Sequence, residues 1–127
     1  MDIDKLKKFE KLPPDVKRQL AIYMSKWNDK KKQSTIKQDF MAFVKHVWPD
    51  FIEGQHHKQV AKKFNEIATG KTKRVIINMA PRHTKSEFAS YLLPAWMVGR
   101  NPKLKIIQST NTTELSVRFG RKAKALM

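Results

Sequence analysis

The sequence predicts an α/β chain in which two parallel strands are joined by a helix and preceded by further helices. Short β-branched and apolar runs at 74–79 and 104–108 are typical of buried strands. Between them, apolar residues recur at helical spacing from Ser86 to about Val98. A strand, a helix and a strand with short links favour a right-handed parallel crossover. Two such strands alone would leave both sheet edges bare, so we expect part of a larger sheet domain.

Three helices are predicted before the first strand. The first begins at Pro14, since proline suits the first turn of a helix, and ends at a basic linker over 30–32. A second runs from a capping box at Thr35 to the break at Pro49, and a third covers 55–69. One face of each helix is expected in the core. These faces are Val16, Leu20, Tyr23, Met24 and Trp27 in the first helix; Phe40, Phe43, Val44 and Val47 in the second; and Val60, Phe64, Ile67 and Ala68 in the third. A last helix, which follows the second strand and is capped by Asn111 or Thr112, should bury Leu115, Phe119, Ala123 and Leu126.

Charge and composition restrict the classes of partner. The 127 residues carry 27 Lys and Arg against 11 Asp and Glu, a net charge of +16 that favours polyanions such as nucleic acid or nucleotides. The absence of cysteine excludes disulfides and cysteine-ligated zinc. His56 and His57 are adjacent on a predicted helix and point about 100° apart, which disfavours one shared metal ion. No apolar run approaches the ~18 residues of a membrane span, so we expect no membrane partner.

The link between the first strand and its helix carries the most specific chemistry. It reads Ala80, Pro81, Arg82, His83 and Thr84, followed by Lys85 and Ser86. A buried strand, a polar loop, Lys-Ser and a helix form the layout of a phosphate-binding P-loop. Loop amides and the helix N-terminus would attract the phosphates, Lys85 would reach the β- and γ-phosphates, and Ser86 would bind Mg²⁺. Met79 and Thr84 stand where the common motif has glycines, so the motif alone leaves open a basic loop without nucleotide chemistry.

A nucleotide-hydrolysing enzyme also needs carboxylates that follow a second apolar strand, to hold Mg²⁺ and to polarise water. The only acids after Ser86 are Glu87 and Glu114, and both lie in predicted helices. We therefore expect a partial P-loop NTPase, with a RecA-like parallel sheet and N-terminal helices, that is truncated before its Walker B strand.

Taken with their flanks, these residues resemble the N-terminal part of the ATPase domain of the large terminase subunit of tailed bacteriophages. The resemblance covers 55–127, while 1–54 match only loosely as an N-terminal helical segment. The matching positions are His56-His57, Gly70, Arg74 to Asn78, Ala80 to Ser86 with its Arg-His pair, Ser90, Pro94 to Trp96, Gly99 to Pro102 and Gln108 to Thr110. Departures are Thr84, where many members have Gly, and Gln55, where many have Trp.

The resemblance implies roles for individual residues toward ATP and Mg²⁺. Lys85 would bind the β/γ-phosphates and Ser86 the Mg²⁺, within a binding loop made by Ala80, Pro81, Arg82, His83, Thr84, Lys85 and Ser86. Arg82 matches a loop arginine that contacts the γ-phosphate, so Arg82 and Lys85 would be the catalytic residues. His83 would orient the loop. Gln55 and His56 fall at the adenine side, although a helix N-cap and first turn explain them equally well.

The resemblance also implies a biological setting. Members of the family hydrolyse ATP to drive double-stranded DNA into a procapsid and cut it with a nuclease domain. Their partners are the portal protein, the small terminase subunit and further copies in a ring, in the host cytoplasm and transiently at the portal. This fragment is expected to be inactive alone, because it lacks the catalytic acids. Two alternatives stay open: a small basic DNA-binding protein without nucleotide chemistry, and a fragment of another P-loop ATPase of the helicase type.

Overall fold

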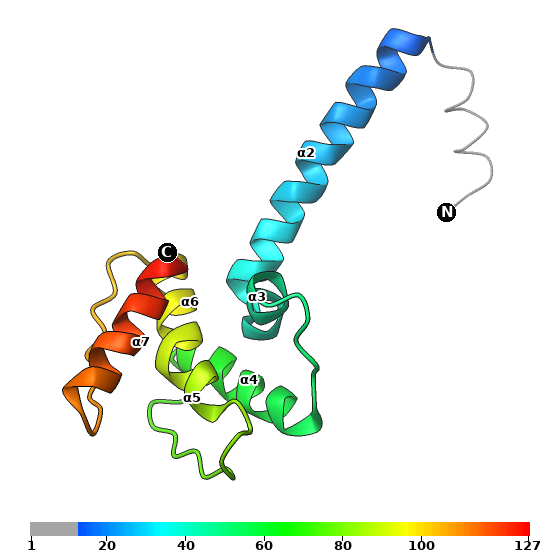
Figure 1. The fold of residues 1–127 in the computed structure, drawn as a ribbon. Helices are drawn as coiled ribbons and strands as arrows, with labels where there is room; N and C mark the ends of the chain where they lie inside the picture. The colour runs from blue at the N-terminus through cyan, green and yellow to red at the C-terminus, as the bar shows by residue number, and fades with distance from the viewer. Residues whose placement is uncertain (1–12) are drawn as a thin grey trace. The chain divides into compact units, whose positions relative to one another are not determined.

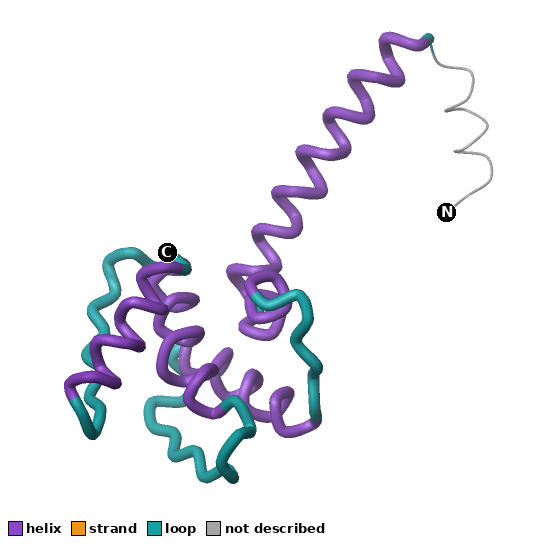
Figure 2. Tube along the Cα trace, in the orientation of Figure 1, coloured by secondary structure: helices purple, strands orange, loops and turns teal. Residues whose placement is uncertain are grey.

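The structure is a computed structural model that describes residues 13–127, and every regular element in this range is helical (Figures 1 and 2). The elements are α2 (Pro14–Gln38), α3 (Phe40–Val47), α4 (Gln55–Ala68), α5 (Lys85–Glu87), the π-helical turn η1 (Phe88–Leu92), α6 (Leu93–Arg100) and α7 (Thr113–Ala125). The chain divides into two units, Met1–Ser34 and Thr35–Met127. The first twelve residues of the N-terminal helical segment predicted over 1–54 lie outside the described residues. No helix within 13–127 combines the length and the apolar character that a bilayer span requires.

Helix α2 runs through the predicted basic linker without a break. Lysine has a good helix propensity, so the lysines at 30–32 extend the helix to Gln38 rather than end it. Its predicted core face is wrong, because α2 buries no residue and Trp27 is 58% exposed. The Lys31 ammonium instead lies 5.4 Å from the centre of the Trp27 ring, a cation–π contact at the surface.

The core of the second unit is built around Phe40, the first residue of α3. The Phe40 ring is fully buried and meets three other rings edge to face: Phe64 of α4 at 5.1 Å, Phe88 of η1 at 5.4 Å and Trp96 of α6 at 5.4 Å between ring centres. Edge-to-face pairs at these separations have favourable quadrupole contacts in addition to the burial of apolar area. The predicted faces of α3 and α4 are confirmed at Phe40, Val44 and Phe64, which are all buried.

A polar cluster fixes the start of α3 against α4. The predicted capping box at Thr35 is wrong, because Thr35 lies inside α2 and the N-cap is Asp39. The Asp39 carboxylate accepts the Ala42 N–H at 2.8 Å and an N–H of the Asn65 amide at 2.7 Å. The Asn65 amide oxygen in turn accepts the Phe40 N–H at 2.9 Å. These bonds hold the first turn of α3 beside α4, with Phe40 directed into the core.

The helical stretch 85–100 contains a π-helical turn just before its proline. Pro94 has no N–H, and its ring would clash with the carbonyl of residue 90 in a regular α-helix. Within η1 the backbone hydrogen bonds span five residues instead of four, so Leu93 donates its N–H to the carbonyl of Phe88. Such single π-turns are a recognised way to accommodate a local conflict in a helix. Three side chains spaced by four residues, Phe88, Leu92 and Trp96, all reach the core.

The predicted α/β fold, with its partial RecA-like parallel sheet, is wrong. Segments 74–79 and 104–108 are extended, but no strand or sheet forms among residues 13–127 (Figure 2). The first segment lies along α4 and the second along η1 and α6, and no backbone hydrogen bond joins them. Apolar alternation survives without a sheet, since Val75 and Ile77 are half-buried while Ile76 is 90% exposed. Apolar patterning thus makes these segments extended, whereas a sheet also requires a neighbouring strand to pair with.

Candidate functional site

The backbone of the loop before α5 is left-handed at two residues that carry side chains. Arg82 has a φ of 65° and Thr84 a φ of 55°, values that cost a residue with a Cβ about 1–2 kcal/mol. Thr84 is also the N-cap of α5, so a left-handed residue is followed directly by right-handed ones. Successive N–H groups in this arrangement converge on one side and form a concavity suited to an anion.

The amides at the start of α5 are available to such an anion. The first bond that closes a turn here runs from the Phe88 N–H to the Thr84 carbonyl at 2.9 Å, so the N–H groups of Lys85, Ser86 and Glu87 precede it. The four leading amides of a helix have no partner within the helix. A phosphate group is the kind of ligand that this geometry and the helix dipole favour.

The side chains predicted to bind the phosphates and Mg²⁺ belong to this loop. Lys85 folds back toward the extended segment, with its Nζ 3.4 Å from the Met79 carbonyl. The side chains of Arg82 and Ser86 are exposed and make no hydrogen bond within residues 13–127. The Pro81 carbonyl accepts the His83 Nδ1–H at 2.9 Å, a contact that fits the expected loop-orienting role of His83. The side chains of Arg82, Lys85 and Ser86 are therefore all accessible to a ligand in solution.

Of the two residues predicted at the adenine side, His56 reaches the loop. Its ring centre lies 5.5 Å from that of His83, and its Nε2 is buried with no hydrogen-bond partner in the described part of the chain. Gln55 begins α4 as an exposed residue, and no contact joins its side chain to the loop within 13–127. The structure therefore brings His56, but not Gln55, to Ala80–Ser86.

His57 makes the closest side-chain contact with the loop, a role that the sequence pattern does not predict. Its ring is 7% exposed, and its Nε2 lies 2.7 Å from Thr84 Oγ1. Its Nδ1 accepts the Gly54 N–H at 2.9 Å. A backbone N–H can only donate, so Nδ1 carries no proton and the neutral ring carries its hydrogen on Nε2. Nε2–H then donates to Thr84 Oγ1, whose own hydrogen goes to the His83 carbonyl at 2.7 Å.

The surroundings of His57 favour this neutral form. Burial lowers the pKa of the imidazole, and the neighbouring His56 lowers it further. Glu53 acts in the opposite direction and His83 lowers the pKa slightly. The Glu53 carboxylate is itself paired with the Lys45 ammonium at 2.7 Å, which limits its influence on the histidine. The ring therefore stays uncharged near neutral pH, as its hydrogen-bond arrangement requires.

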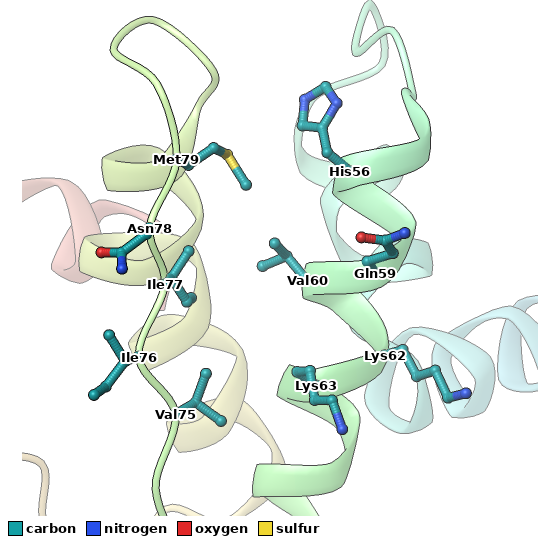
Figure 3. Close-up of a pocket in the computed structure, with 10 residues that line it drawn as sticks. All are labelled: His56, Gln59, Val60, Lys62, Lys63, Val75, Ile76, Ile77, Asn78 and Met79. Atoms are coloured by element: carbon teal, nitrogen blue, oxygen red, sulfur yellow. The ribbon is translucent and has the colours of Figure 1, made fainter.

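A cavity of about 590 Å³ adjoins the loop but does not include it (Figure 3). It lies between α4 and the extended segment and is lined by His56, Gln59, Val60, Lys62 and Lys63 on one side and by Val75 to Met79 on the other. None of the residues Ala80–Ser86 lines it. The cavity follows the unpaired flank of 75–79, so we place the candidate phosphate site at the loop and not in this cavity.

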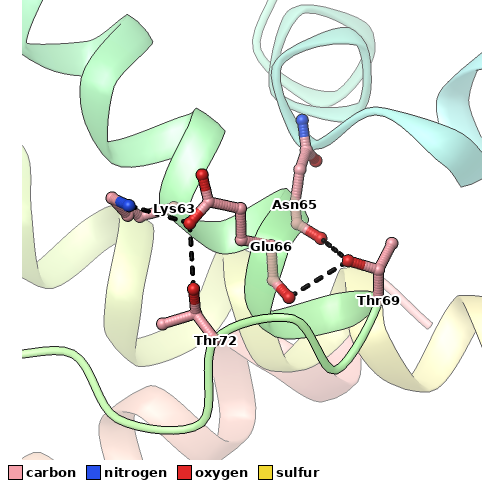
Figure 4. A network of polar contacts seen from close by, with 5 residues as sticks. All are labelled: Lys63, Asn65, Glu66, Thr69 and Thr72. Carbon is pink, nitrogen blue, oxygen red and sulfur yellow. Dashed lines mark hydrogen bonds and ion pairs between the residues drawn. The ribbon is translucent and has the colours of Figure 1, made fainter.

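The other end of the extended segment is fixed by polar contacts at the end of α4 (Figure 4). The Glu66 carboxylate accepts bonds from the Lys63 ammonium at 2.8 Å and the Thr72 hydroxyl at 2.9 Å. Both contacts lower the pKa of Glu66. Gly70 follows the C-cap Thr69 with a φ of 75°, as its predicted place just after the helix requires. The chain thus leaves α4 in a defined direction and returns along it toward the loop.

One signal for His57 was present in the sequence. A histidine at the third helical position after a glycine can cap the N-terminus by accepting the N-cap N–H, as it does here. Its second contact, with a residue 27 positions away, depends on the tertiary fold. No cluster of three histidine or acidic residues in the described range could hold a metal ion.

No family model, no curated protein and no solved structure matches this chain.

Proposed function

We propose that the loop Ala80–Ser86 binds the triphosphate of ATP together with Mg²⁺. The observation that carries this proposal is the reversal of backbone hand at Thr84, which turns the leading amides of α5 toward one side. Strained left-handed residues with side chains cluster at functional sites. Lys85 supplies a flexible positive charge beside these amides, and the Ser86 hydroxyl is the oxygen available to Mg²⁺.

Within this proposal, the residues divide the binding between them. The amides of 85–87 bind phosphate oxygens, Lys85 neutralises the β- and γ-phosphates, and Arg82 faces the terminal phosphate from the exposed edge of the loop. His56 is the one predicted adenine-side residue that the fold brings to the loop. Bound Mg-ATP would supply the phosphoanhydride whose cleavage drives work in the proteins that this chain resembles.

We further propose that the chain is the nucleotide-binding part of a DNA-packaging motor similar to the large terminase subunit. Support comes from the Arg-His pair ahead of Lys85 and from the flanking residues that resemble that family. Double-stranded DNA, portal protein, small terminase subunit and further copies of the chain are the corresponding partners. The competing proposal is a basic DNA-binding protein without nucleotide chemistry, and the net charge of +16 favours it equally.

Titration calorimetry with Mg-ATP on the 127-residue chain tests the nucleotide site. Lys85→Ala should weaken binding by about 10- to 100-fold, the effect of one hydrogen bond to a charged group. Lys103→Ala removes an exposed lysine outside the loop and serves as the matched control, which should bind as the wild type does. If Lys85→Ala folds normally and binds Mg-ATP unchanged, the loop is not the phosphate site. If that variant also keeps its DNA affinity, the basic DNA-binding protein becomes the better assignment.

A further inference from the structure

We propose that His57 is a positioning residue that holds the phosphate loop in its binding conformation through the side chain of Thr84. This inference rests on the proposed nucleotide function and extends it to a residue outside the loop. Thr84 stands where the common motif has glycine, and it adopts the left-handed conformation that glycine adopts freely. A β-branched residue does so only when its surroundings favour that conformation.

The compensating contacts form a relay of hydrogen bonds in a single direction. It runs from the Gly54 N–H to His57 Nδ1, from His57 Nε2–H to Thr84 Oγ1, and from the Thr84 hydroxyl to the His83 carbonyl. The His57 ring and the Thr84 hydroxyl each accept one bond and donate another, so the hydroxyl is oriented and the peptide that leads into Thr84 is fixed. Glycine could not take part, since the relay needs a hydroxyl at position 84.

The histidine can serve as a fixed anchor because its own position is determined by packing. Its ring contacts the ring of Phe51 at 4.8 Å and that of Phe88 at 5.3 Å between centres. Phe88 belongs to the buried cluster and directly follows α5. His57 and the helix that follows the loop therefore pack on the same buried cluster, which keeps Thr84 at a constant place relative to the start of α5.

Gly54 is the residue that permits this arrangement at the other end of the relay. A Cβ added to Gly54 would lie 2.9 Å from Cε1 of His56 and 3.4 Å from Nδ1 of His57. The absence of a side chain at position 54 lets both imidazoles approach the N-terminus of α4. This glycine is thus needed for close approach, while its backbone is extended and unstrained.

Two pairs of variants test the relay on the full 127-residue chain, with Mg-ATP affinity measured by calorimetry and folding checked by circular dichroism. Thr84→Val keeps the shape and the β-branch but removes the hydroxyl, and should bind Mg-ATP about tenfold more weakly. Thr84→Ser keeps the hydroxyl and should stay within about twofold of the wild type. A glutamine amide reaches about as far as Nε2, so His57→Gln can still donate to Thr84 Oγ1 and should retain Mg-ATP affinity. An asparagine amide reaches only about as far as Nδ1, so His57→Asn should lose that affinity.

A measurement without nucleotide separates the relay from the proposed function. Nitrogen-15 NMR of the imidazole should show His57 as the Nε2–H tautomer, and nitrogen-15 relaxation of the Thr84 and Lys85 amides should show an ordered backbone in the wild type and greater motion in Thr84→Val. If the wild-type chain shows the tautomer and the ordered loop yet binds no Mg-ATP, the relay stands and the nucleotide function fails. If the chain binds Mg-ATP but Thr84→Val binds equally well, or His57 carries its proton on Nδ1, the positioning role is refuted.

Discussion

Replacement of Phe40 by alanine should remove a large share of the stability of the second unit. The ring is fully buried and contacts three aromatic rings at 5.1–5.4 Å. Truncation of a buried Phe to Ala commonly costs about 3–5 kcal/mol, and the edge-to-face pairs favour the upper end because each adds about 0.5–1.5 kcal/mol beyond burial. Since a domain has only about 5–15 kcal/mol in total, this loss is a large share of the free energy of unfolding.

Urea denaturation followed by far-ultraviolet circular dichroism measures the effect, with Phe43→Ala as the control. Phe43 lies on the same short helix but is only partly buried, so its loss should be about 1 kcal/mol, typical of a point substitution. Phe40→Leu keeps most of the apolar volume and should fall between the two. A loss below about 1.5 kcal/mol for Phe40→Ala, outside the range for buried aromatic residues, would show that α3 does not pack on α4, η1 and α6.

Three further predictions concern pH, glycine and DNA. The folded-state pKa of His57 is lowered, so the neutral ring contributes fully to stability above its ordinary pKa of 6.5. This contribution is lost as the pH falls from 6.5 through the folded-state pKa. Urea titrations between pH values of about 7.5 and about 5 should show the loss of stability in the wild type but not in His57→Gln. Gly120→Ala in α7, where a new Cβ meets no atom within 4 Å, should raise the free energy of unfolding by about 0.5–1 kcal/mol. Gly54→Ala should lower it, because the new Cβ would crowd the two imidazoles. If both variants changed the melting temperature in the same direction, the packing around Gly54 would be contradicted. With its charge of +16, the chain should bind duplex DNA without sequence preference, and a salt titration by fluorescence anisotropy should show log K falling steeply with log salt; flat or sequence-selective binding would argue against counterion release.

Helices defined by local signals were predictable from the sequence. Periodic apolar residues and strong end signals placed α4, and the break before Pro49 ended α3 where the structure ends it. Thr112 caps α7 as one of the two expected residues, and its hydroxyl accepts the Leu115 N–H at 3.3 Å. These features depend on residues within about one turn of each other, which a single sequence displays directly.

Features that depend on a distant partner were not predictable. The alternation at 74–79 correctly indicated an extended segment, but a sheet also depends on a neighbour that the pattern does not contain. The face of Trp27 looked like core because periodicity shows that a face is apolar and not that it is covered. The contact between His57 and Thr84 joins α4 to the loop, and no spacing rule connects residues so far apart. The phosphate-binding role of Ala80–Ser86 stays a prediction, and it rests on residue types that are consecutive in the sequence.

The π-helical turn at 88–92 determines the azimuth of the loop around the helix axis. On a regular α-helix, side chains four residues apart drift by about 40° at each step, so Phe88, Leu92 and Trp96 would wind away from one line. A wider turn opposes that drift, which lets all three reach the core while Lys85 and Ser86 keep a fixed direction at the helix start. Deletion of one residue from this turn would restore an ordinary ladder and rotate everything before it by about 100°. The helix would survive, but the loop Ala80–Ser86 would face elsewhere, so the length of this one turn sets the direction of the proposed site as much as the residues of the loop do.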